Sequence, residues 1–145
     1  MNDTLDSFLD ELQGRVYDDT RESMGEEVYR RWKNPVYLKK MEQPSAQAEL
    51  TGSCGDSITI YLKIMDGRVI AANFETTGCG SSQVSGEVVC EYAIGKSVEE
   101  AGMLDGKDVL QVLGGLPEEN THCAYLAAET LREAARNYLQ SKVTL

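Results

Sequence analysis

Three short stretches of the chain bring together residue types that bind metals or act as nucleophiles. Each holds a cysteine, and two of them add a carboxylate or an imidazole: Cys54 with Asp56, Cys79 alone, and His122 with Cys123. Thiolate, imidazole and carboxylate ligands suit tetrahedral zinc or an iron–sulfur cluster. Cys79 follows Cys54 by 25 residues and Cys123 follows Cys79 by 44, which matches no zinc-finger spacing. Spacing alone therefore leaves open a metal site and three unrelated buried thiols.

The pattern around Cys123 predicts that it lies in the first turn of a helix. Apolar residues recur at steps of three and four from Cys123 to Leu139. Pro117 breaks the chain in front of them, and Asn120 or Thr121 can serve as the N-cap. Unpaired backbone N–H groups and the positive end of the helix dipole would there favour a thiolate over a thiol.

The elements that must position these residues begin with a predicted sheet. Residues 47–51 form a short strand, and residues 58–64 form the clearest one, with apolar and polar residues in alternation. Asp66-Gly67 is a two-residue hairpin signal, followed by a return strand over 68–77. We expect Ile70, Ala72 and Phe74 to share one face of that strand. Cys54 then precedes the clearest strand, and Cys79 follows the return strand.

Helices complete the predicted fold. Residues up to about Lys33 are helical in pattern, and Pro35 ends that helix. Ser81 or Ser82 can cap a helix that runs to about Ile94, and short helices follow near 98–103 and 107–113. The fold class is therefore α+β, with a small, mostly antiparallel three-stranded sheet packed against several helices. We divide the chain into an N-terminal helical arm, 1–25, and one domain, 26–145.

Composition limits the classes of function. A formal charge of −10 over 145 residues argues against a nucleic-acid surface and favours a basic partner protein. No apolar run approaches the roughly 20 residues of a membrane span, and the first residues lack the pattern of a signal peptide. We therefore expect a cytoplasmic protein, in which four reduced cysteines indicate metal binding or reactivity rather than disulfides. Cys90, beside two valines in a predicted helix, is expected to be a core residue.

The three stretches, in their order and separations, resemble the IscU/NifU-type iron–sulfur cluster assembly scaffolds. The resemblance covers roughly Glu26 to Tyr138 and rests on Cys54-Gly55-Asp56, Gly78-Cys79-Gly80-Ser81 and His122-Cys123. It implies a scaffold rather than an enzyme, which assembles a cluster, most often 2Fe-2S, and passes it to apo-proteins. A cysteine desulfurase would supply the sulfur, and zinc can occupy the isolated protein. The resemblance implies that three cysteines, Asp56 and His122 form the cluster and metal site, and it leaves a homodimer open.

The chain departs from the family pattern at one motif. Members served by a dedicated chaperone carry Leu-Pro-Pro-x-Lys before the His-Cys pair, whereas this chain has Leu116-Pro117-Glu118-Glu119-Asn120. Dependence on a chaperone is therefore an open question.

Three other functions compete with the scaffold. One is a zinc-bound sulfur acceptor, or sulfurtransferase, which would use the same residues; relatives of that kind carry an extra segment that is absent here between Cys79 and Cys123. A thiol hydrolase is the second, although His122 and Cys123 as neighbours on a helix would diverge. The third is a structural zinc domain, which chelation would unfold.

Overall fold

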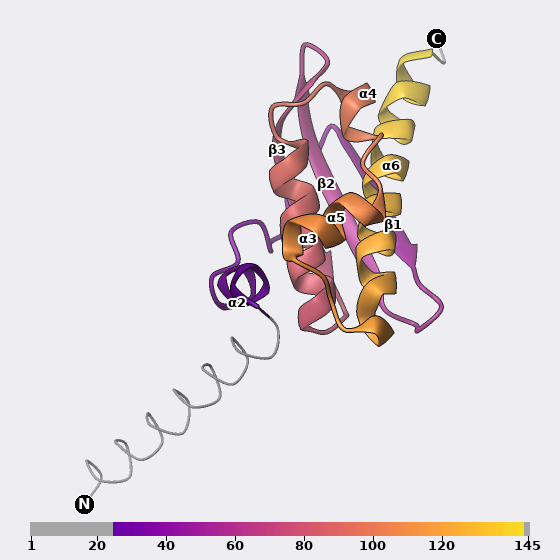
Figure 1. Cartoon of the computed structure of the whole chain (residues 1–145). Coiled ribbons are helices and arrows are strands. Elements are labelled where there is room, and N and C mark those ends of the chain that lie inside the picture. Colours follow the sequence, from indigo (N-terminus) through magenta and orange to yellow (C-terminus); the bar gives the residue numbers. More distant parts are fainter. Residues whose placement is uncertain (1–24, 144–145) are drawn as a thin grey trace, which may run out of the picture.

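The computed structural model describes residues 25–143, which form one sheet with helices packed against it (Figure 1). The strands are β1 (Ala46–Thr51), β2 (Ser57–Met65) and β3 (Arg68–Thr76). They pair antiparallel in the order β1-β2-β3. The predicted α+β fold with a three-stranded sheet is confirmed. The predicted N-terminal arm lies, but for Gly25, outside the described residues.

Alternation along β2 builds the core, as predicted, because Ile58, Ile60 and Leu62 are all buried. The hairpin at Asp66-Gly67 is also confirmed, and both residues have positive φ, as a type I′ turn requires. The prediction for β3 was wrong at Ile70, which is 48% exposed, whereas Val69 is 1% exposed. The register between β2 and β3 shifts at Lys63/Ile64 and pairs Ile64 with Val69, so the apolar face changes phase near the turn.

In chain order, the helices are α2 (Glu26–Lys33), α3 (Gly80–Ala93), α4 (Val98–Ala101), α5 (Gly106–Leu113), the 3₁₀ turn η1 (Glu118–Asn120) and α6 (Thr121–Val143). The expectation that Ser81 or Ser82 caps α3 was wrong. Cys79 occupies the N-cap with extended backbone angles, and both serines lie inside the first turn. The turn from β3 into α3 is therefore shorter than predicted, and both serines are buried.

One face of the sheet is covered by α3 and α6, with α5 packed across the pair (Figure 1). α6 contacts mainly β1, and α3 contacts β3. The close approach of α3 depends on Gly86, since a Cβ there would lie 2.4 Å from two ring carbons of Phe74. Cys90 is fully buried in this core, as expected.

The segment between α2 and β1 is fixed to α3 by a buried carboxylate. Glu87 is 2% exposed and accepts hydrogen bonds from the backbone N–H groups of Val36 at 2.7 Å and Tyr37 at 2.8 Å. The neighbouring Trp32 lies against the start of α3, where a Cβ on Gly80 would meet its ring at 3.3 Å. The residue next to Cys79 is thus held by the packing of α2.

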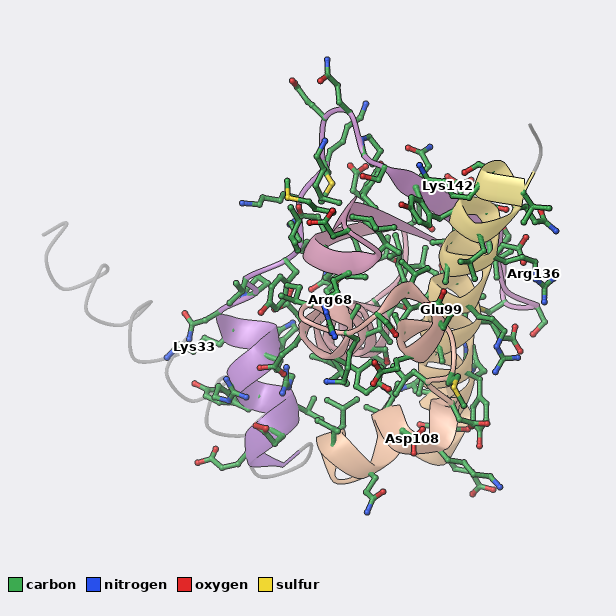
Figure 2. The ribbon with its side chains drawn as sticks, turned by 90° about the horizontal axis from the view of Figure 1, so that it is seen from above. Lys33, Arg68, Glu99, Asp108, Arg136 and Lys142 are labelled. Carbon is green, nitrogen blue, oxygen red and sulfur yellow. The ribbon has the colours of Figure 1, made fainter. Side chains whose placement is uncertain are left out.

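The outer surface of the described residues is charged. Figure 2 shows Lys33 of α2 and Arg136 of α6 at opposite edges of the molecule. Among residues 25–143, no helix is long and apolar enough to cross a membrane.

Candidate functional site

The three cysteine-bearing loops converge at one end of the sheet. Cys54 lies in the β1–β2 loop, Cys79 at the N-cap of α3, and Cys123 in the first turn of α6. Burial raises the pKa of Cys123, and the nearby Cys79, Cys54 and Asp56 side chains add to that effect, so these groups share one locality. The structure therefore brings together side chains that lie up to 69 residues apart in the sequence.

Direct contacts join the other members of the site. The carboxylate oxygen Oδ2 of Asp56 lies 3.6 Å from the sulfur of Cys54. The same oxygen would lie 3.3 Å from a Cβ on Gly78, so it reaches the turn that carries Cys79. The Nε2 atom of His122 lies 3.7 Å from the sulfur of Cys123. All five residues predicted for the site are thus at the same end of the molecule, and the expected divergence of His122 from Cys123 is not observed.

The β1–β2 loop lies over the start of α6. A Cβ on Gly52 would lie 3.2 Å from the side chain of Leu126 and 3.8 Å from the sulfur of Cys54. Gly55 adopts a φ of +91°, a conformation that favours glycine, and this turns the loop between Cys54 and Asp56. The loop glycines therefore let Cys54 approach the helix that carries Cys123.

The three cysteines of the site differ in their exposure to solvent. Cys54 and Cys79 are exposed, whereas Cys123 is 4% exposed. Burial is the main cause that raises the pKa of Cys123, and a hydrogen bond from Ser82 acts in the opposite direction. The first turn of α6 was expected to favour the thiolate, but the surroundings as a whole raise the pKa of the Cys123 thiol.

The five side chains do not form a compact coordination sphere. Among residues 25–143, no group of three Cys, His, Asp or Glu side chains is positioned to hold a metal ion. The donor types nevertheless fit a soft metal or a cluster, because thiolates select zinc and iron–sulfur centres.

Sequence analysis missed two further residues of the site. The hydroxyl of Ser82 donates a hydrogen bond to the sulfur of Cys123 at 3.5 Å. Glycine at position 78 leaves space for that hydroxyl, because a Cβ there would lie 2.4 Å from it. The sequence signal was a glycine before Cys79 and two serines after it, but the serines were expected to cap the helix.

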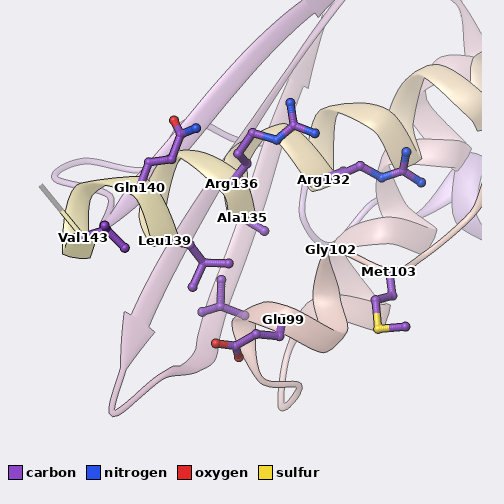
Figure 3. Close-up of a pocket in the computed structure, with 10 residues that line it drawn as sticks. Glu99, Gly102, Met103, Arg132, Ala135, Arg136, Leu139, Gln140 and Val143 are labelled. Carbon is purple, nitrogen blue, oxygen red and sulfur yellow. The ribbon is translucent and has the colours of Figure 1, made fainter.

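A separate apolar groove lies between α4 and the C-terminal half of α6, lined by Met103, Leu139 and Val143 with Arg132 and Arg136 beside them (Figure 3). None of its lining residues belongs to the cysteine site.

A family model described as "NifU-like N terminal domain" matches residues 23–144 of the chain. The chain is 34% identical over 116 residues to a protein of Archaeoglobus fulgidus named an iron–sulfur cluster assembly scaffold protein of the IscU type, which covers 79% of this chain and 76% of that protein. It is 31% identical over 118 residues to a Drosophila melanogaster protein named iron–sulfur cluster assembly enzyme IscU, over 78% of this chain and 76% of that protein.

A solved structure supports the fold alone. The crystal structure of a SUF-system scaffold protein from Fervidobacterium islandicum superposes with a TM-score of 0.66 at 23% identity, over 80% of this chain and 98% of that one.

Proposed function

The chain belongs to the family of NifU-like N-terminal domains, and on that premise we propose that it is a scaffold on which an iron–sulfur cluster is assembled and then passed to apo-proteins. The observation that carries the proposal is the convergence of three cysteines, a carboxylate and an imidazole from the β1–β2 loop and the starts of α3 and α6. Sulfur would come from a cysteine desulfurase, and the cluster would be of the 2Fe-2S type. The protein acts as a carrier rather than an enzyme, in a compartment such as the cytoplasm where thiols stay reduced.

The site would hold its cargo through Cys54, Asp56, Cys79, His122 and Cys123. Three thiolates supply affinity, and an oxygen or nitrogen donor in the fourth position holds iron less tightly than a fourth thiolate would. The exposure of Cys54 and Cys79 supports transfer, because an acceptor protein can reach these two sulfurs from solvent. The buried Cys123 would stay with the cluster longest.

Anaerobic reconstitution of the full chain with ferrous iron, cysteine and a cysteine desulfurase tests the proposal. We expect a coloured cluster that can be transferred to an apo-ferredoxin. Cys54→Ser, Cys79→Ser and Cys123→Ser should each lose it. Cys90→Ala is the matched control, because it removes a thiol that is buried in the core of α3 and should keep the cluster. A colourless protein that retains zinc would favour the sulfur-acceptor function instead.

Asp56 is expected to favour release of the cluster. Its carboxylate lies beside Cys54 at 3.6 Å and is a harder donor than the sulfurs around it. Asp56→Ala should therefore lengthen the lifetime of the assembled cluster, measured from the decay of its visible absorption. Loss of the cluster at the parental rate would contradict this role.

A further inference from the structure

Two buried serines in the first turns of α3 use their hydroxyl groups differently. The hydroxyl of Ser85 donates to the backbone carbonyl of Ser81, four residues earlier, at 2.7 Å. This is the usual bond of a serine inside a helix. The hydroxyl of Ser82 leaves its own helix and donates to the sulfur of Cys123 on α6 at 3.5 Å. Ser82 is 4% exposed, so water does not compete for this hydrogen bond.

The backbone on the other side holds the hydroxyl of Ser82 in place. A Cβ on Gly78 would lie 2.4 Å from Oγ of Ser82 and 2.7 Å from its Cβ, so the turn passes directly over this side chain. The same point lies 3.3 Å from Oδ2 of Asp56. The Ser82 hydroxyl therefore lies between the turn at Gly78 and the sulfur of Cys123, inside the candidate site.

We propose that Ser82 is a positioning residue whose hydroxyl holds the sulfur of Cys123 and weakens that sulfur as a donor to the cluster. The inference rests on the proposed scaffold function. A hydrogen bond to a coordinating thiolate withdraws electron density from it, which raises the reduction potential of the cluster and weakens the iron–sulfur bond. Cys123 is the buried ligand that would otherwise hold the cluster most firmly. Ser82 thus adjusts the one buried sulfur of the candidate site.

Ser82→Ala in the full chain tests this role, with Ser85→Ala as the control. Both variants remove one buried hydroxyl from α3, but only Ser82 touches a sulfur. After reconstitution, Ser82→Ala should have a lower reduction potential in a mediated titration and a two- to tenfold slower transfer to apo-ferredoxin, roughly the range for one hydrogen bond of ordinary net strength. Ser85→Ala should match the parent in both measurements, and circular dichroism checks that each variant is folded.

A second variant displaces the hydroxyl without deleting it. Gly78→Ala places a methyl group against Ser82 and should change the potential in the same direction as Ser82→Ala. Cobalt(II) provides a readout that does not depend on cluster assembly, because its sulfur-to-metal absorption band reports the donor strength of the thiolates. We expect that band to move to longer wavelength in Ser82→Ala and to stay unchanged in Ser85→Ala.

The outcomes separate the two proposals. A parent that binds cobalt but forms no cluster would overturn the scaffold function, and the cobalt band would still decide the role of Ser82. If the reduction potential, the transfer rate and the cobalt band are all equal in Ser82→Ala and the parent, only the role of Ser82 is overturned. A chain that binds neither probe would overturn both.

Discussion

Glu87 is a buried carboxylate in the middle of α3, and its replacement by glutamine is expected to loosen the segment that joins α2 to the sheet. The two carboxylate oxygens accept hydrogen bonds from the backbone N–H groups of Val36 and Tyr37, about 50 residues earlier in the chain. Glutamine keeps the shape of the side chain but replaces one acceptor oxygen with an NH₂ group. One backbone N–H would then face a donor instead of an acceptor.

The magnitude follows from the number and type of the bonds. A hydrogen bond to a charged group contributes about 1.5 to 3 kcal/mol, and a neutral one about 1 kcal/mol. Glu87→Gln loses one charged bond and converts the other into a neutral one, while the cost of burying the carboxylate disappears. We expect a net loss of about 2 kcal/mol in the free energy of unfolding. With a urea dependence of about 2 kcal/mol per molar for a chain of this size, the midpoint should fall by about 1 M.

Urea unfolding followed by fluorescence and far-UV circular dichroism measures this loss. Trp32 is the single tryptophan of the chain and lies on α2, next to the segment that Glu87 holds. Glu133→Gln is the control, because it removes the same charge from an exposed pair with Arg136 at 3.5 Å. Such surface pairs contribute about 0 to 1 kcal/mol. Equal midpoints for Glu87→Gln and Glu133→Gln would refute the reasoning.

Two further predictions concern the cysteines and the packing of α3. In the folded apo-protein, iodoacetamide should label Cys54 and Cys79 first, Cys123 slowly, and Cys90 only after denaturation, as mapped by peptide mass spectrometry. Burial, with the charge of Glu87, raises the pKa of Cys90 well above its ordinary value, so its reactive thiolate would form only at higher pH; labelling of Cys90 at the rate of Cys79 at neutral pH would contradict this. Gly86→Ala should lower stability by about 1 to 3 kcal/mol in thermal unfolding, because its methyl group would overlap the ring of Phe74. The methyl group of Gly102→Ala would meet no atom nearer than the Cβ of Ala135 at 3.3 Å, so this variant should cost less; an equal cost would show that overlap is not the cause.

Sequence patterns were sufficient to predict the sheet and to place the residues of the candidate site at the ends of the elements that carry them. Alternation in β2 and the Asp66-Gly67 turn define a hairpin by local chemistry alone, and cysteines at the ends of elements are brought together once those elements pack. The exposure of Ile70 was not predictable in this way. It depends on a register shift between β2 and β3, which is a property of two strands together and leaves no mark on the periodicity of either.

The finer features of the site also depend on long-range packing. The hydrogen bond from Ser82 to Cys123 depends on how α3 packs against α6, which no local pattern reveals. The bonds of Glu87 could not be predicted, because its two partners are backbone groups that no side-chain pattern reveals.

Because the three cysteines lie far apart along the chain, a cluster bound by all of them would stabilise the folded protein. A group bound by all of them would act as a cross-link that closes loops of 25 and 44 residues. By the chain-entropy model of cross-links, each closure is worth on the order of 3 to 4 kcal/mol against the unfolded chain. The loaded protein would therefore resist unfolding more than the empty one. By reciprocity, a partner that moves one of the three cysteine-bearing segments away would weaken binding of the cluster by the other two. Local opening of a single segment is therefore a route to release of the cluster.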